Sequence, residues 1–395
     1  MQKLLPIATL LALAAFAFSG SDYYTGLAIK VMIYAIFALS LQLLVGGAGL
    51  VSLGHAAFFG IGAYVAALLS PESEAASLWW LLPAALLAAA LYAVVTGALA
   101  LRTRGVYFIM VTLAFSQMAY YVFHDTKVGG GSDGIYLYFR PELALGSWVP
   151  FDLGNATTFY FFVLACLALT WGFLALLRRS PFGAALAGIR INEQRMRAAG
   201  YSTYPYKLTA YVVGATLAGL AGFLFALKDG FVTPELLAWE QSGLVLLMVI
   251  LGGMASLGGA VIGTVALVLM QELFQSQALF GDYARHWHLP LGIAIIALVA
   301  LLPNGIAGLP AQWRQRRDAR VAAAHAAGSP AAGAPAAGSP AAGSPAARSP
   351  AAGSPAAGSP AVSTVRLPQG RLPQDRLPQD RLPQDRLPVQ GEPHV

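Results

Sequence analysis

The stretch GGAGLVSLGHAAFFGIGAYV, residues 46–65, is apolar enough to lie in a membrane, yet it contains six glycines and one histidine. Glycine is a poor helix former in water, and an imidazole is costly in hydrocarbon. Small residues let neighbouring helices approach closely, whereas glycine-interrupted helices line polar paths through membranes. The stretch indicates a membrane segment with one of these two roles, and both stay open at this point.

The composition places the whole chain in a membrane. Hydrophobic residues make up 57% of the sequence and charged residues only 11%, whereas a soluble domain carries roughly 25% charged residues. Cys166 is the one cysteine and lies in an apolar run, so the chain has no disulfide framework.

Apolar runs long enough to cross a bilayer recur along the chain. A spanning helix needs about 20 mostly apolar residues, and this rule predicts an all-α, polytopic helical bundle of about 8–10 transmembrane helices. The candidate spans are 4–20, 25–45, 51–70, 79–101, 106–123, 156–177, 207–227 and 289–308, together with a longer run at 242–272.

Two of these runs allow alternatives. The run 242–272 is interrupted by Gly252-Gly253 and Gly258-Gly259, and we expect two shorter helices that meet at the glycines, since 31 residues exceed one crossing. The run 4–20 also resembles a signal peptide. We expect a retained first helix, because the topology below needs it.

Loop charges predict which side each loop faces, because Lys and Arg are retained on the cytoplasmic side. The loop 178–207 holds six Lys and Arg residues against Glu193 alone, which predicts a cytoplasmic loop. Acidic loops at 71–78, 124–155 and 228–241 are predicted to lie outside. Alternating crossings satisfy these assignments if 242–272 leaves the outer side and returns to it.

The chain divides into a transmembrane domain, residues 1–312, and a tail, residues 313–395. The tail consists of Ala-Ala-Gly-Ser-Pro units followed by RLPQD repeats. Frequent proline and few large apolar side chains predict a disordered, cytoplasmic tail. Its role is either to bind a partner domain or, as we prefer, that of a neutral repeat expansion.

The loop 178–207 contains signals for two short helices. Ser180 followed by Pro181 is a helix start, residues 192–199 could form a second helix, and Gly200 is a fitting terminator. Such a basic element either lies on anionic lipid or docks into another protein. Its small residues favour protein docking, because they permit close approach.

Motifs for nucleotide binding and enzyme catalysis are absent from the sequence. It contains no P-loop, no H-E-x-x-H, no Cys/His cluster and no G-x-S-x-G. We therefore expect no metal, no cofactor and no catalytic residue in this chain, and no nucleic acid as a partner.

Four blocks together resemble a known family. SPFGAALAGIRINEQRMRAAGYSTYPYKLTAYVVGATLAGLAGFLFAL, GLVSLGHAAFFGIGAYVAALL, GGGSDGI and LLMVILGGMASLGGAVIGTVAL are similar to LivM-type permeases, the inner-membrane subunits of branched-chain amino acid ABC importers. The resemblance covers about residues 25–310 in the same order and excludes the tail. One departure is Gly258, where the family commonly has a large residue.

This resemblance implies partners and a docking region. It implies a LivH-type second permease, two ABC ATPase subunits that use ATP, a periplasmic binding protein that docks on the outer loops, and a location in the bacterial inner membrane. Residues 181–200 would be the coupling region that contacts an ATPase. The positions that we assign to this coupling are Arg190, Asn192, Glu193 and Gly200.

The glycine-rich segments SLGHAAFFG (52–60) and SLGGAVIG (256–263) share their first letters and are the candidates for the translocation path. Close helix packing is the alternative for each glycine. We interpret the histidine as a hydrogen-bonding residue and not as a proton carrier. The candidate path residues are Ser52, Gly54, His55, Gly60, Gly252, Gly253, Ser256 and Gly258.

The resulting hypothesis is a permease subunit that moves branched-chain or related amino acids by alternating access, driven by separate ATPase subunits. Urea or short amides are alternative substrates. A stand-alone secondary carrier is a second class, although the predicted spans contain no Asp or Glu that would support it. A scaffold whose Pro-rich tail recruits partners is a third.

Overall fold

The structure is a computed structural model that describes residues 21–308, apart from residues 72, 146–147, 152, 255 and 303–304. The predicted first helix, 4–20, and the predicted tail, 313–395, lie outside the described residues. The division of the chain at residue 312 therefore stays a prediction.

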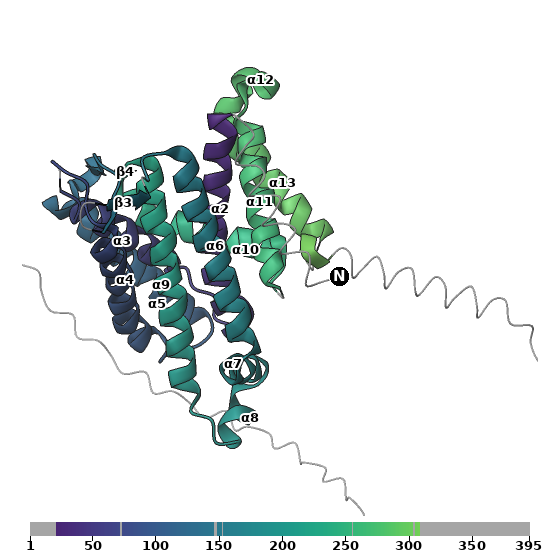
Figure 1. Cartoon of the computed structure of the whole chain (residues 1–395). Coiled ribbons are helices and arrows are strands. Elements are labelled where there is room, and N and C mark those ends of the chain that lie inside the picture. Colours follow the sequence, from purple (N-terminus) through teal and green to yellow (C-terminus); the bar gives the residue numbers. More distant parts are fainter. Residues whose placement is uncertain are drawn as a thin grey trace, which may run out of the picture. The chain divides into compact units, whose positions relative to one another are not determined.

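Helices dominate the described part of the chain, and seven of them are long and apolar enough to cross a membrane (Figure 1). The predicted fold class, a polytopic helical membrane protein, is confirmed. The seven are α2 (Asp22–Gln42) with its π-helical extension η1 (Leu43–Ala48), α4 (Leu78–Ala100), α5 (Val106–Asp125), α6 (Ala156–Arg179), α9 (Thr203–Asp229), α11 (Leu257–Gln275) and α13 (His288–Leu301), whose candidate span is counted to Gly308.

Shorter helices and turns complete the described elements. Three shorter apolar helices are α3 (His55–Leu68), α7 (Pro181–Ile191) and α10 (Trp239–Gly252). The remaining short elements are η2 (Lys127–Gly129), η3 (Gly131–Asp133), α8 (Glu193–Ala198), η4 (Pro234–Leu237), α12 (Gln277–Phe280), η5 (Gly281–His286) and η6 (Ile306–Gly308).

The span predicted at 51–70 is wrong at its beginning, because α3 starts only at His55. Gly49 adopts a left-handed conformation with φ +71°, which ends the preceding helix. The Ser52 Oγ then accepts a hydrogen bond from the Gly54 amide at 3.2 Å. Such local bonds offer the backbone an alternative to the helix, so residues 50–54 form a non-helical entry.

The glycine-broken run forms two helices, as predicted. Gly253 has φ +106°, and the Ser256 Oγ begins α11 by accepting the Gly259 amide at 3.0 Å. The Gln42 amide donates to the Met254 carbonyl at 2.6 Å near one end of α2, and Tyr23 near the other end bonds Glu272. The second helix therefore returns along α2, as the predicted topology requires (Figure 1).

The loops gather into two groups, one at each end of the bundle. One hollow of about 490 Å³ is lined by residues from three loops that are far apart in the sequence, namely residues 48–51, 103–106 and 108–109, and Ile189, Arg190 and Glu193. At the other end, strand β1 (Ile135–Tyr136) pairs antiparallel with β4 (Phe231–Val232). Successive loops of the described helices thus alternate between the two ends of the bundle, as the loop charges predict. The grouping alone does not say which end is cytoplasmic.

The strands were not predicted. A second pair, β2 (Leu143–Leu145) and β3 (Trp148–Phe151), forms a hairpin in the same long loop. Arg140 secures this loop, because its guanidinium donates to the carbonyls of Leu227 and Leu153, each at 3.1 Å. These elements need long-range partners, and a search for apolar runs does not detect them.

The centre of the bundle depends on close approach at glycines. A Cβ atom on Gly62 of α3 would collide with the backbone of Gly219 in α9, and one on Gly222 would collide with the Phe59 carbonyl. Fully buried aromatic side chains, such as Phe58 and Tyr211, fill the space around this crossing. Small residues at helix contacts are the usual means of packing in membranes, so this part of the glycine pattern serves packing.

Candidate functional site

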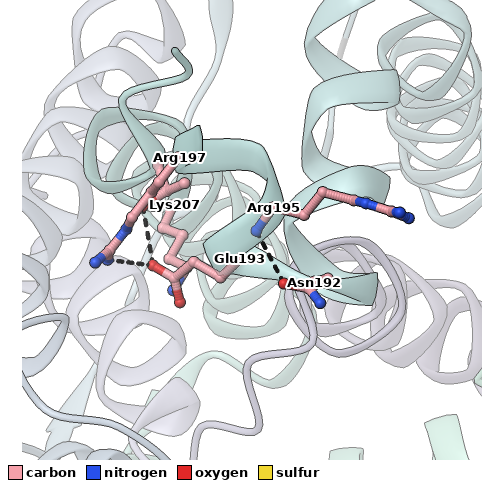
Figure 2. A network of polar contacts seen from close by, with 6 residues as sticks. Asn192, Glu193, Arg195, Arg197 and Lys207 are labelled. Atoms are coloured by element: carbon pink, nitrogen blue, oxygen red, sulfur yellow. Dashed lines mark hydrogen bonds and ion pairs between the residues drawn. The ribbon is translucent and has the colours of Figure 1, made fainter. Parts of the chain in front are cut away.

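The element formed by α7 and α8, residues 181–198, is the best-defined surface feature at one end of the bundle. The Ser180 Oγ accepts the Gly183 amide at 3.3 Å, and Pro181 occupies the first turn, so the predicted helix start is confirmed. Asn192 begins α8, since its side chain accepts the Arg195 amide at 2.9 Å (Figure 2). Gly200, with φ +89°, closes the element as predicted.

Glu193 braces α8 against α9 (Figure 2). Its carboxylate accepts hydrogen bonds from the Lys207 ammonium at 2.6 Å, from Arg197 at 2.5 Å and from the Thr203 hydroxyl at 2.9 Å. Burial alone would raise the pKa of this carboxyl, but the bonds from Lys207, Thr203 and Arg197 outweigh it and lower the pKa to about 2. The side chain therefore stays ionised at neutral pH and serves an internal contact.

Arg190 ties the same element to the glycine-rich entry of α3. Its guanidinium donates to the Gly46 carbonyl at 2.5 Å, and its aliphatic stem lies against Gly49. A movement of α7 would therefore pull directly on residues 46–54. This contact links the predicted coupling region to the first candidate path segment.

The outward face of this element carries other residues. Ile191 is 86% exposed, a large value for an apolar side chain, and Ala184, Ala187 and Arg195 are exposed beside it. Of the four predicted coupling positions, Glu193 and Arg190 make the internal contacts described above, and Asn192 and Gly200 shape the helix ends. The sequence reasoning missed Ile191 as a surface residue, although an isoleucine among small and basic residues was a usable signal.

His55 lies in a fully buried polar cluster at the start of α3. Its Nε2 is 2.8 Å from the Ser40 hydroxyl, and the Phe37 ring stacks on the imidazole. The amide of Ala56 donates to the Ser242 hydroxyl at 2.8 Å. The histidine thus makes the hydrogen bond that was predicted. The sequence did not reveal its partner Ser40, or Ser242 as the acceptor of the Ala56 amide.

The other first-segment candidates pack closely against neighbouring helices. Ser52 is fully buried, and a Cβ on Gly54 would collide with the carbonyl of Thr112 in α5. Gly60 lies against the side chain of Leu237. These residues occupy helix contacts in this conformation, and their role in a path stays a prediction.

The second segment separates into crowded and open positions. A Cβ on Gly252 would collide with the carbonyl of Gly259, so α10 and α11 cross here through glycine alone. Gly253 makes the turn, and Ser256 caps α11. A Cβ on Gly258, in contrast, would meet only the Trp171 ring at an ordinary 3.6 Å. The crowding falls on Gly252 and Gly259, and not on Gly258.

Within the described ranges, no three His, Cys, Asp or Glu side chains lie close enough together to hold a metal ion.

Comparison with known proteins agrees with this architecture. A family model described as the permease component of branched-chain amino acid transport systems matches residues 23–301. The chain is 33% identical over 324 residues to the LivM permease proteins of Salmonella typhimurium and Escherichia coli, covering 77% of this chain and 75% of each relative. It is also 25% identical over 296 residues to the LivH permease protein of Salmonella typhimurium, covering 70% of this chain and 92% of that protein. No solved structure matches.

The family model covers most of the chain, from the first residues of α2 to the end of α13. These relatives are transporter permease subunits and not enzymes. The chain belongs to the family of permease components of branched-chain amino acid transport systems.

Proposed function

We propose that this chain is the LivM-type permease subunit of an ATP-driven importer for branched-chain amino acids in a bacterial inner membrane. Substrate moves by alternating access, and separate ATPase subunits hydrolyse the ATP. A LivH-type permease is the second membrane subunit, two ABC ATPases bind on the cytoplasmic side, and a periplasmic binding protein delivers the amino acid. The LivM and LivH relatives support this assembly.

The observation that carries the proposal is the α7–α8 element. It is braced on α9 through Glu193 and on the entry of α3 through Arg190, and it presents the exposed Ile191 on its outward face. An apolar anchor on a rigid element suits a protein partner. Force from an ATPase would reach the buried His55 cluster through the Gly46–Arg190 bond.

The charges support the sidedness of the proposal. The end that holds α7 and α8 is rich in arginine, whereas the end with β1 and β4 carries Asp125, Asp133 and Glu142. The positive-inside rule places the arginine-rich end in the cytoplasm. The binding protein then docks at the end with the paired strands.

Reconstitution of the complete importer tests this function. Proteoliposomes that hold this chain, the second permease and the ATPases should accumulate leucine when ATP and the loaded binding protein are supplied on their proper sides. A hydrolysis-deficient ATPase should abolish uptake and leave the complex assembled. Uptake that persists without ATP and stops when the proton gradient is collapsed would instead identify a secondary carrier.

The substrate class requires its own measurement. Leucine, isoleucine and valine, urea and a short amide should be compared as competitors of radiolabelled leucine uptake in the same proteoliposomes. We expect competition by the three amino acids alone. Uptake of urea or the amide in place of leucine would move the chain to the alternative substrate class.

A further inference from the structure

A polar hollow lies between α5, η4 and the first turn of α10, and none of the candidate site residues named above lines it. It has a volume of about 430 Å³, within the range of small-molecule sites. Its polar lining consists of Gln117, Tyr120, Tyr121, Glu235, Glu240 and Gln241.

The floor of the hollow is level with the middle of the bundle. After β4 the chain folds inward through η4, and the Leu237 carbonyl accepts a hydrogen bond from the Ser116 hydroxyl at 3.0 Å. Ser116 is halfway along α5, and the Leu237 side chain packs on Gly60, which lies well inside α3. The prediction that residues 228–241 form an outer loop is therefore wrong for its second half, because residues 234–241 return into the bundle.

Two amide oxygens at this site have no partner. The Oε1 atoms of Gln117 and Gln241 are both buried and, among the described residues, accept no hydrogen bond. Leaving a buried acceptor unsatisfied costs about 1–3 kcal/mol, so the arrangement is suited to a donor that comes from outside the chain.

The lining is suited to a positively charged donor. Glu235 and Glu240 are carboxylates, and the glutamine oxygens are acceptors. Among the residues that line the hollow none is a Lys, Arg or His. An ammonium group with its three donors matches this set of acceptors.

The same hollow offers a place for a carboxylate. Ala238, Glu240 and Gln241 all line it, so the first turn of α10 forms part of its wall. This 14-residue helix has no side-chain cap at its beginning, and its N-terminal amides carry partial positive charge. Membrane helices that begin inside the bundle bind anionic substrate groups in this way.

The hollow is open on the side of the molecule. Tyr121 is 53% exposed, and Glu235 and Glu240 are exposed as well. Charged groups at this depth are costly in hydrocarbon and normally face a water-filled cavity or another helix bundle. This face therefore fits the second permease subunit, with the path between the two.

We propose that this hollow is the part of the transport path that binds the charged main-chain end of a free amino acid, with the ammonium group on Glu240, Glu235 and the glutamine oxygens, and the carboxylate on the first turn of α10. The proposal rests on the function proposed above and adds the position and chemistry of the substrate site. The aliphatic side chain of the substrate then points away from this polar lining.

Thermal stability of the detergent-solubilised importer, without binding protein, measures the binding directly. L-leucine should raise the melting temperature of the complex. Leucinamide, which lacks the carboxylate, and 4-methylpentanoate, which lacks the ammonium, should each raise it far less. An equal shift with 4-methylpentanoate would overturn the proposal.

Variants of the lining test the same point in transport. Glu240→Gln and Gln117→Leu should each reduce leucine uptake about tenfold at equal complex levels, since each removes a bond to a charged group. Matched controls on α11 are Glu272→Gln, which retains an acceptor for Tyr23, and Gln275→Leu, which lies on the exposed end of that helix. Both should transport normally.

The outcomes separate the two proposals. Failure of the wild-type complex to show ATP-driven uptake would contradict the proposed function. Normal uptake and a normal leucine shift in Glu240→Gln and Gln117→Leu, in a complex that does transport leucine, would contradict this site alone.

Discussion

At the scale of single residues, the glycines of the segment 252–259 differ in how closely neighbouring atoms surround them. Gly252 and Gly259 allow α10 and α11 to touch through their backbones, while Gly258 has space around it. Spacing in the sequence could not distinguish them, because it does not show which side of α11 faces α10. Gly243 lies on α10, and a methyl group added there would meet no atom within 4 Å, so this helix supplies its own control.

Alanine substitutions at these glycines should therefore differ. Gly252→Ala should destabilise the protein by about 1–3 kcal/mol, because the added methyl forces the two backbones apart. Gly243→Ala and Gly258→Ala should be neutral or stabilising by up to about 1 kcal/mol, since alanine is the better helix former. Melting temperatures of the purified variants in one detergent measure the difference, and equal destabilisation of all three would contradict this account.

Glu193 illustrates what a sequence can and cannot predict about a charged residue. Its position in the coupling loop was evident, but its partner Lys207 is 14 residues away and meets it only because the chain turns between α8 and α9. The carboxylate was predicted to face an ATPase. In the structure it holds α8 against α9, so its effect on coupling would be indirect.

The brace gives Glu193 a defined pH dependence. Its folded pKa of about 2 lies below the ordinary 4.5. The contribution to stability is therefore fully present above about pH 4.5 and is lost as the pH falls through about 2. Amide hydrogen exchange of residues 193–203, corrected for the intrinsic pH effect, should be equally slow at pH 7 and pH 6, and protection should fall as the pH drops below about 4.5. Glu193→Gln should exchange about fivefold faster at pH 7, and a wild-type protein that keeps its full protection down to pH 2 would refute the brace.

At the scale of elements, the helices that follow simple rules were predictable and those that depend on distant partners were not. Ser180, Pro181 and Gly200 act locally, so the beginning and end of the α7–α8 element were evident from the sequence. The late start of α3 depends on Ser52 turning back on Gly54 and on Thr112 of α5 filling the space beside that glycine. An unbroken apolar run contains no sign of either contact.

The α7–α8 element should bind the ATPase through its exposed face. Ile191→Glu should abolish copurification of the ATPase subunits, because it places a charge at the one large apolar residue of that face, whereas Ile191→Leu should preserve it. The variant should fold normally, since the wild-type side chain is 86% exposed. Val128→Glu, at an apolar position that is 61% exposed in η2, is the matched control and should retain the ATPases. Retention by Ile191→Glu would move the docking surface elsewhere.

At the scale of the whole molecule, hydropathy and charge together predicted the crossings and the grouping of loops. They did not predict that η4 returns to the middle of the bundle, because that path depends on the Ser116 hydroxyl donating to the Leu237 carbonyl and on Gly60 leaving space for the Leu237 side chain. The consequence is functional. A segment interpreted as an outer loop places Glu240 in one hollow with the unpartnered Oε1 atoms of Gln117 and Gln241, and this is where the candidate substrate site lies.

The sidedness of the molecule can be measured because the chain has one cysteine, Cys166, which is buried. In a Cys166→Ala background, Tyr138→Cys in the loop with the strands should react with a membrane-impermeant maleimide in intact spheroplasts. Gln194→Cys in α8 should react only after permeabilisation. The reverse labelling would invert the proposed topology and remove the α7–α8 element as an ATPase site.

Intact and permeabilised spheroplasts can also show on which side of the membrane each end of the chain lies. A protease-sensitive tag after residue 395 should be cleaved only in permeabilised spheroplasts, because α13 begins at the end with the paired strands and runs toward the arginine-rich end. A tag at residue 1 should remain attached to the mature protein and be protected in the same way if the first helix is retained. Loss of that tag with a C-terminal tag that stays inside would identify a cleaved signal peptide, and it would leave every crossing from α2 onward unchanged.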